Sequence, residues 1–345
     1  MSLKLICKIC NTPSVSSLGE IEGYRADTYF DVLACSVCGS NFVNADSDDK
    51  IYEAIYKNVT EVPGYARYFH YARQVLKEKN PLYYLMNCED CYWGIVQSIL
   101  AETGGNRAKN MIWEVGCGQG YLTYALMKAG FNAIGLDISE SAIALARQRY
   151  GNYYFCGDVK SYSIEMNKRP NYIILSEVIE HLSDPVAFLA ELKDCLQPGG
   201  AIIVTTPNKS ICSLKTIWDT ELPPIHLWWF TEEGLEALGK SLSCQVQFSN
   251  MDEFYIRNVR FKKNSDDYTC RRKPILNKEY RVILRPTSPS PPLNLMLKSV
   301  LMYVLPKKIY RKIQIKMAER SGFEVCTGST PMSLCATFKQ FSHEQ

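Results

Sequence analysis

Three glycines follow an acidic residue in the stretch EVGCGQG, residues 114–120. Glycines at alternate positions, here Gly116, Gly118 and Gly120, allow the tight turn between a strand and a helix that holds a nucleotide. The dinucleotide fingerprint G-x-G-x-x-G would place its third glycine at Tyr121, so this spacing differs from it. A carboxylate at Glu114 would repel a pyrophosphate, whereas an ammonium or sulfonium group would accept it. The stretch therefore favours a nucleoside that carries an amino acid over NAD.

Two further acidic residues follow the next two apolar runs, Asp137 in GLDIS and Asp158 in CGDV. A carboxylate can accept hydrogen bonds from both hydroxyls of a ribose. Each aspartate could instead cap the helix that follows it, because Asp suits that position. Their place at successive predicted strand ends favours the ligand role, since open α/β sheets bind ligands at the carboxyl ends of their strands.

The motif series resembles the class I S-adenosylmethionine-dependent methyltransferases. The stretches EVGCGQG, GLDIS, CGDV, LSEVIEHLSDP and CLQPGGAIIVTTPN occur in that family's order over about residues 111–250. The resemblance implies that S-adenosylmethionine is the cofactor, that Asp137 partners the ribose hydroxyls and that Asp158 meets the adenine amino group. The expected cofactor contacts are Glu114, Gly116, Cys117, Gly118, Gly120, Asp137, Ile138, Asp158, Val159 and Ser176.

Methyl transfer is an in-line displacement, so the protein must orient the nucleophile and, for a hydroxyl, remove its proton. The chain has four histidines, and two of them, His181 and His226, follow the predicted fourth and fifth strands. Either is a candidate general base, although structural hydrogen bonding would explain each equally well. With Glu177 and Glu180, His181 forms a Glu-x-x-Glu-His pattern that resembles ubiquinone-pathway catechol O-methyltransferases, where it is linked to a divalent metal. On a helix these side chains would share a face, but the pattern also occurs in family members without a metal. The expected catalytic residues are His181, His226 and Glu177.

Four cysteines near the N-terminus form two C-x-x-C pairs, Cys7 with Cys10 and Cys35 with Cys38. Two such pairs supply the tetrahedral thiolate set of a structural zinc ion, which leaves no open position for catalysis. About 45 residues are too few to bury a core unaided, so a metal would stabilise this module. A third pair, Cys88 and Cys91, lies in a stretch that reads as helix, where core packing is the better interpretation.

A cysteine module before a methyltransferase core is similar to the arrangement in sugar- and glycan-modifying methyltransferases. More distantly it resembles zinc-bearing ribosomal-RNA guanine methyltransferases. The first 50 residues contain more acidic than basic side chains, which argues against nucleic acid as a partner.

The elements that must position these residues follow from the hydrophobic pattern. Apolar runs alternate with helical periodicity from residue 111 to about 250, which predicts a largely parallel sheet with helices on both faces. The resemblance adds a seventh, antiparallel strand at SLCATFKQ, residues 333–340. We therefore expect an α/β, Rossmann-like fold. The expected organisation is a zinc-ribbon-like module (1–45), a helical cap (46–110), the methyltransferase core (111–250 and 332–345) and a basic insertion (251–331).

The insertion concentrates the positive charge of the chain. Residues 251–320 contain many more Lys and Arg than Asp and Glu, whereas the formal net charge of all 345 residues is only +3. The segment could be a solvated lid over the acceptor pocket, a contact to anionic lipid headgroups, or a holder for a phosphate-bearing or lipid-linked acceptor. The chain opens without an apolar signal segment, and its many cysteines suit a reducing compartment. We therefore expect a cytoplasmic protein, with a peripheral position at the membrane as the alternative.

The sequence favours methyl transfer to a small-molecule acceptor, a saccharide or sugar-derived metabolite. One alternative is O-methylation of a quinone-like or aromatic hydroxyl acceptor. Another is a non-catalytic cofactor-binding protein that uses the zinc module for docking. A complete motif series argues against this last alternative, because a non-catalytic copy has no need for every cofactor contact.

Overall fold

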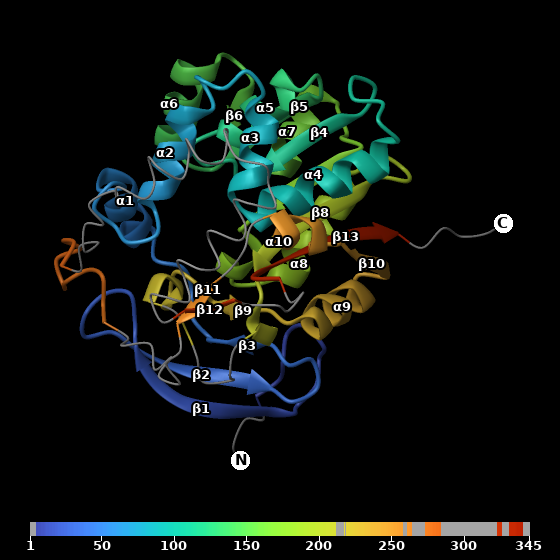
Figure 1. The fold of residues 1–345 in the computed structure, drawn as a ribbon. Coiled ribbons are helices and arrows are strands. Elements are labelled where there is room, and N and C mark those ends of the chain that lie inside the picture. The colour runs from blue at the N-terminus through green and yellow to red at the C-terminus, as the bar shows by residue number, and fades with distance from the viewer. Residues whose placement is uncertain are drawn as a thin grey trace.

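A computed structural model describes residues 5–211, 217, 219–257, 261–263, 273–283, 323–325 and 331–340. Its centre is a seven-stranded sheet in the order β10-β13-β8-β7-β4-β5-β6 (Figure 1). The five strands from β4 to β8 pair in parallel, and the last strand lies antiparallel between β8 and β10. This confirms the expected sheet. Its strands are β4 (Met111–Val115), β5 (Asn132–Asp137), β6 (Tyr154–Cys156), β7 (Tyr172–Ser176), β8 (Ala201–Pro207), β10 (Cys244–Phe248) and β13 (Ser333–Gln340).

Helices cover both faces of this sheet, because its central strands are apolar on both sides. One face packs against α3, α4, α5 and α6, and the other against α7, α8 and α9. An oxygen-bearing side chain at the N-cap starts most of the helices that follow a strand: Ser139, Asp158, Asp184 and Thr231 each accept a backbone N–H of the first turn. The helices are α5 (Tyr121–Lys128), α6 (Glu140–Tyr150), α7 (Val159–Met166), α8 (Pro185–Cys195) and α9 (Glu232–Ser241). The sequence pattern did not predict α7, which is a short helix with little buried surface.

The segment before the sheet is helical, as expected for residues 46–110. It contains α1 (Asp49–Lys57), α2 (Ala66–Gln74), α3 (Pro81–Cys88) and α4 (Asp90–Thr103). The single helix expected around Cys88 and Cys91 is interrupted, because Glu89 has an extended backbone with φ −138° and ψ 150°. Cys91, at the start of α4, is buried in the hydrophobic core, which confirms the core-packing interpretation for Cys91, whereas Cys88 at the end of α3 is half-buried.

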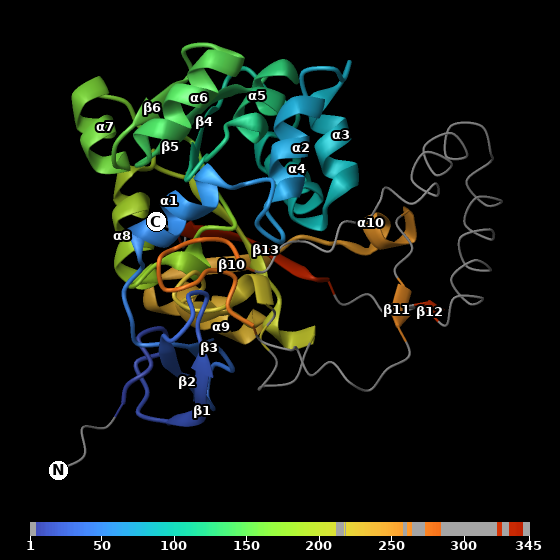
Figure 2. The ribbon, with the colours of Figure 1, turned by 90° about the vertical axis from the view of Figure 1, so that its left-hand side faces the viewer.

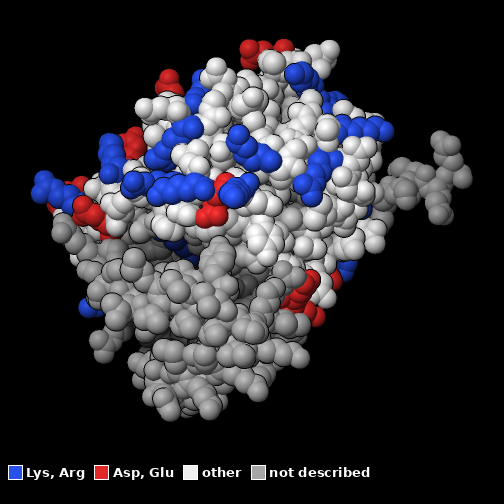
Figure 3. All heavy atoms as spheres, turned by 45° about the horizontal axis from the view of Figure 1, so that its top comes forward, with Lys and Arg blue, Asp and Glu red and all other residues white. Residues whose placement is uncertain are grey.

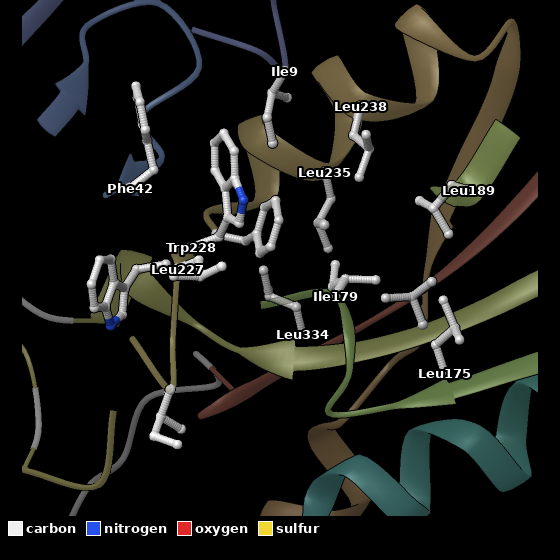
Figure 4. Packing of buried hydrophobic residues seen from close by; sticks show 14 of the residues in the cluster. Ile9, Phe42, Leu175, Ile179, Leu189, Leu227, Trp228, Leu235, Leu238 and Leu334 are labelled. Atoms are coloured by element: carbon white, nitrogen blue, oxygen red, sulfur yellow. The ribbon is translucent and has the colours of Figure 1, made fainter. Parts of the chain in front are cut away.

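The N-terminal module forms a second, four-stranded sheet of β1 (Val15–Glu22), β2 (Tyr29–Cys35), β3 (Asn41–Phe42) and β9 (Trp228–Trp229). The fourth strand, β9, comes from the segment that follows β8, nearly 200 residues later in the chain. The two sheets also share one hydrophobic cluster. Figure 4 shows Ile9 and Phe42 of the module beside Trp228, Leu235 and Leu238. The module is therefore packed into the body of the protein.

Short elements complete the described chain. They are the 3₁₀ turns η1 (Ile179–His181), η2 (Lys209–Ile211) and η3 (Asp219–Glu221), the helix α10 (Asp252–Arg257), and the two-stranded pair β11 (Phe261–Lys263) and β12 (Phe323–Val325). Figure 2 shows α10, β11 and β12 to one side of the main sheet. Most of the basic insertion lies outside the described residues, as does its expected contact with an acceptor or a membrane.

One described part of the insertion, residues 273–283, lies against the N-terminal module. The backbone N–H groups of Ile275 and Leu276 donate to the Tyr24 carbonyl at 2.9 and 3.0 Å. Lys278 Nζ lies 3.1 Å from Asp27 Oδ2. Within the described part of the chain, no helix combines the length and apolar character that crossing a bilayer requires.

A basic face is also present outside the insertion. Figure 3 shows Lys and Arg side chains gathered over the face formed by the upper helices of Figure 1. Several cations of the helices lie against aromatic rings: Arg73 and Arg149 both lie over Phe69, and Lys128 lies over Tyr124. Positive charge is thus also concentrated on one face outside the insertion, although the formal net charge of the full chain is only +3.

Candidate active site

The glycine-rich turn connects β4 to α5 at the carboxyl edge of the sheet. Gly116, Gly118 and Gly120 all have positive φ, at 72°, 48° and 78°, which side chains other than glycine rarely tolerate. The N–H groups of Gly116 and Cys117 donate to the Leu136 carbonyl at 2.8 and 3.1 Å, so the end of β5 holds the turn. A Cβ added at Gly120 would lie 2.6 Å from Tyr154. Gly120 therefore allows close packing against Tyr154, whereas a Cβ at Gly118 would meet only the Tyr56 hydroxyl, at 3.9 Å, so a nucleoside can approach the backbone there.

Asp137 lies at the end of β5, beside this turn. Its Oδ2 accepts a hydrogen bond from Gly118 N and its Oδ1 accepts one from Ser139 N, each at 2.8 Å. Burial raises the pKa of this carboxyl, and the two hydrogen bonds act in the opposite direction. The structure thus brings Asp137 and the glycines together, and Asp137 fixes the shape of the turn.

Asp158 has a helix-capping contact. It is exposed, and its Oδ1 accepts the Ser161 N–H at 2.8 Å at the start of α7. The hydrogen bonds that Ser161 donates to Asp158 lower the pKa of the Asp158 carboxyl. Beside it, Val159 is buried, while Ile138 is 81% exposed at the edge of the sheet. The capping alternative is therefore present in the structure, and because Asp158 is exposed, a ligand could also reach it.

Glu114 and Cys117 are buried beneath the turn rather than exposed on it. The Glu114 carboxylate accepts a hydrogen bond from the Thr123 hydroxyl of α5. Desolvation raises the pKa of Glu114 to about 8. Most molecules therefore carry a proton on this group at pH 7, which removes the charge that was expected to repel a pyrophosphate.

Ser176 and the turn that follows β7 link the cofactor edge to a cluster of titratable side chains. Ser176 is half-buried at the strand end. A Cβ added at Gly116 would lie 2.7 Å from Val178, so the turn after β7 packs directly against the glycine-rich turn. The candidate catalytic residues therefore lie next to the expected cofactor position.

Glu180, His181 and His226 form this cluster. One possible ligand atom from each lies within 4.8 Å of the others, and the two imidazole rings meet edge to face with centroids 4.7 Å apart. His181 Nδ1 lies 2.6 Å from the Ile225 carbonyl. Because a carbonyl only accepts, this nitrogen carries the proton and Nε2 is left as the acceptor. The structure thus brings both predicted histidines together.

Glu177 lies outside this cluster. The expectation that Glu177, Glu180 and His181 share one face of a helix is wrong, because only Ile179–His181 form a short 3₁₀ turn. Glu177 precedes this turn with a left-handed backbone, φ 56°, and its N–H donates to Thr205. Such a conformation costs energy in a non-glycine residue and often accompanies functional sites.

Burial controls the protonation of the cluster. Desolvation raises the pKa of Glu180 to about 8 and lowers the pKa values of His181 and His226. Both carboxylate oxygens of Glu180 and the Nδ1 atom of His226 are buried without a hydrogen-bond partner among the described residues. Buried polar atoms are normally paired, so this cluster has the free valences of a site that takes up a ligand or a cation.

Sequence reasoning missed the tyrosines and charged residues that surround the cluster. Tyr52 of α1 lies edge to face with His181, with ring centroids 6.1 Å apart. Glu180 raises the pKa values of Tyr52 and Tyr65 further, beyond the effect of their burial. Glu221 of η3 is also buried, and desolvation raises its pKa to about 8. The spacing of Tyr52 and Tyr56 by four residues on a predicted helix was the signal available, since such residues share a helix face.

The four N-terminal cysteines converge. The Sγ atoms of Cys7 and Cys38 are 3.8 Å apart, those of Cys10 and Cys35 are 3.5 Å apart, and all four lie within 4.8 Å of one another. Two C-x-x-C pairs that are separated in the sequence therefore form one compact set of four sulfurs.

Comparison with known proteins supports the fold assignment. Residues 94–247 match the model of a methyltransferase domain. A probable S-adenosylmethionine-dependent methyltransferase of Mycolicibacterium smegmatis is 31% identical over 164 residues, which are 46% of this chain and 62% of that protein. The ubiquinone biosynthesis O-methyltransferase of Methylococcus capsulatus is 32% identical over 103 residues, which are 28% of this chain and 44% of that protein. The chain thus spans about half the length of the curated relatives it matches.

A solved structure, that of the plantazolicin methyltransferase BamL in complex with a triazolic desmethylPZN analog and SAH, is similar at a TM-score of 0.45 and 13% identity. The similarity covers 85% of this chain and 96% of that one. Residues 94–247, which match the methyltransferase-domain model, contain the strands β4 to β8, the glycine-rich turn and the Glu180–His181 turn. The family-model match and the mostly parallel seven-stranded sheet together support an S-adenosylmethionine-dependent methyltransferase domain at residues 94–247.

Proposed function

We propose that this protein transfers a methyl group from S-adenosylmethionine to a hydroxyl oxygen of a quinone-like or aromatic acceptor. The observation that carries the proposal is the buried cluster of Glu180, His181 and His226 beside the glycine-rich turn. Relatives whose names state ubiquinone biosynthesis O-methylation support this acceptor class over the saccharide.

The residues of the cluster suit proton removal from a hydroxyl. Burial keeps His181 and His226 neutral, and a neutral imidazole nitrogen is a proton acceptor. As the acceptor oxygen forms its bond to the methyl carbon, the carbon–sulfur bond breaks and S-adenosylhomocysteine leaves. The hydroxyl proton passes to the imidazole. Tyr52 and Tyr65 provide aromatic surface on which a flat acceptor ring could rest.

In a second arrangement, which would replace proton transfer to the imidazole, the cluster fits a divalent cation, as the Glu-x-x-Glu-His pattern suggests. A carboxylate oxygen of Glu180, Nε2 of His181 and Nδ1 of His226 are the atoms that would hold it. The last of these and both Glu180 oxygens make no hydrogen bond among the described residues, and Glu180 Oε1 lies 3.7 Å from His181 Nε2. The Ile225 carbonyl orients His181 as outer partners do in metal sites. A bound cation lowers the pKa of a hydroxyl that it holds.

Labelled-methyl transfer tests this function. We expect the purified full chain to methylate a simple catechol, and His226→Gln to lower kcat more than tenfold. His70→Gln, the same change at an exposed histidine of α2, serves as the matched control variant. Methylation of nucleotide sugars but not of catechols would show that the acceptor is a saccharide. S-adenosylhomocysteine binding without turnover of either class would support the non-catalytic alternative.

For the four cysteines we propose a structural zinc ion. Tetrahedral coordination with zinc–sulfur bonds of about 2.3 Å places the sulfurs about 3.8 Å apart, close to the observed 3.8 and 3.5 Å. Protein purified without chelators should contain one zinc per chain, and Cys10→Ser should contain none. Zinc-free wild-type protein with an unaltered structure would contradict the proposal.

A further inference from the structure

We infer that the zinc module is a positioning element for the acceptor site, because it holds the segment that carries His226. This inference rests on the proposed zinc ion and deepens the proposed function of the Glu180–His181–His226 cluster. It assigns the module a role in arranging the catalytic side chains, in addition to stabilising the N-terminal residues.

The backbone connects the module to the cluster in two steps. The first step is the pairing of β3 with β9, in which Phe42 lies opposite Trp228 and Val43 N donates to the Leu227 carbonyl at 2.9 Å. The second step is the hydrogen bond from Leu227 N to the Glu180 carbonyl, at 2.8 Å. Leu227 directly follows His226, so its two backbone groups join the module to both halves of the cluster.

The Cys35–Cys38 pair of the module also holds the segment that carries His226. The Thr231 hydroxyl donates to the Cys38 carbonyl at 2.8 Å, and both residues are buried. The space beside the knuckle is small, because a Cβ added at Gly39 would lie 3.1 Å from Thr231 Oγ1. A change in the fold of the Cys35–Cys38 knuckle therefore removes a hydrogen bond at the far end of β9.

Trp228 adds a side-chain connection. Its ring stacks on Phe42 at 4.8 Å between centroids, and its Nε1 donates to the Leu182 carbonyl at 2.9 Å. Leu182 directly follows His181, whose Nδ1 is held by the Ile225 carbonyl. Trp228 thus fixes the turn that carries His181 relative to the segment that carries His226.

The cofactor edge depends on other contacts. The glycine-rich turn is held by the Leu136 carbonyl and the Asp137 carboxylate of the main sheet. Loss of the zinc ion should therefore disturb the acceptor side of the site and leave cofactor binding nearly unchanged.

The experiment compares three single variants with the wild type. Cys10→Ser removes a zinc ligand, and Trp228→Phe keeps the ring stack but loses the hydrogen bond to Leu182. Trp113→Phe is the matched control, because Trp113 is a buried indole whose nitrogen has no hydrogen-bond partner among the described residues. Each is assayed for zinc content, S-adenosylhomocysteine affinity, Mn²⁺ affinity and the ¹⁵N imidazole resonances of its histidines, assigned with single His→Gln variants.

We expect Cys10→Ser to lose zinc and Trp228→Phe to retain it. Both should shift the His181 and His226 resonances, leave His70 in place and keep S-adenosylhomocysteine affinity within about twofold. Mn²⁺ affinity should fall about tenfold or more, because a metal site loosens when its supporting shell is removed. Trp113→Phe should match the wild type throughout.

Unchanged His181 and His226 resonances in a folded, zinc-free Cys10→Ser protein would overturn the inference. If Cys10→Ser does not fold, unchanged resonances in Trp228→Phe would overturn it. A wild type that binds no Mn²⁺ would reject the proposed cation site alone, and the imidazole resonances would then decide the positioning role.

Discussion

Removing the Asp137 carboxylate should weaken both cofactor binding and the fold. The structure gives Asp137 two backbone partners, Gly118 N and Ser139 N, each at 2.8 Å. The Asp137→Ala variant therefore loses the contacts that shape the glycine-rich turn, together with the expected partner of the ribose hydroxyls.

The two effects can be estimated separately. Both backbone N–H groups are half-exposed, so water can replace part of each bond, and the free energy of unfolding should fall by about 1–3 kcal/mol. A ribose diol that loses a charged acceptor costs about 1.5–3 kcal/mol. That corresponds to a loss of affinity of roughly 10- to 150-fold.

Calorimetric titration with S-adenosylhomocysteine measures the affinity, and urea denaturation measures the stability. The matched control is Asp184→Ala, which removes a helix-capping carboxylate from α8 and should cost about 1 kcal/mol of stability without a change in affinity. If Asp137→Ala loses stability but binds the cofactor within twofold of the wild type, Asp137 only shapes the turn and the assignment of its ribose contact is wrong.

Three further predictions follow from the cofactor edge. The pKa of Glu114 is raised by burial to about 8, so the folded state retains a proton that the unfolded state loses above about pH 4.5. Stability should therefore fall as pH rises from about 4.5 to 8, by up to about 1.4 kcal/mol per pH unit from this group, and denaturant titrations of Glu114→Gln should show a shallower slope. Gly120→Ala should cost about 2 kcal/mol or more, because its φ is +78° and the added Cβ would lie 2.6 Å from Tyr154. Gly104→Ala, with φ +54° and open space around it, isolates the backbone strain; equal melting temperatures for the two variants would contradict the steric argument. Tyr56 should contribute to the cofactor pocket, because its hydroxyl would lie 3.9 Å from a Cβ at Gly118. Tyr56→Ala should therefore weaken S-adenosylhomocysteine affinity roughly fivefold. An unchanged calorimetric titration would show that Tyr56 does not contact the cofactor.

The pattern of apolar runs was sufficient to predict the main sheet. The apolar runs MIWEV (111–115) and YIILS (172–176) coincide with β4 and β7, because strands buried on both faces read as continuous apolar runs between polar turns. The short helix α7 was missed, since little of it is buried and its sequence has weak periodicity. The cysteine spacing likewise predicted one set of four sulfurs. Each C-x-x-C pair is a local feature, and two such pairs match the four thiolates of a tetrahedral metal site.

Protonation states required the tertiary structure. Glu114 was expected to act as a charge at the cofactor edge, but its pKa depends on burial beneath α5, and burial is decided by residues distant in the sequence. The helix expected for Glu177–His181 failed for a similar reason. The left-handed backbone at Glu177 follows from packing against β8, where Thr205 accepts its N–H, and it overrides the local preference for helix.

The sequence by itself determined the local features. These are the strand and helix periods, the glycines that permit a tight turn, and the residue types able to bind a cofactor, a metal or a proton. Only the tertiary structure decided which of them meet. The pairing of Phe42 with Trp228 joins segments nearly 200 residues apart, and it places the cysteine module against the segment that carries His226. Such a contact has no periodic signature in the chain, because it is selected by the shape of a shared core and not by the neighbours of either residue.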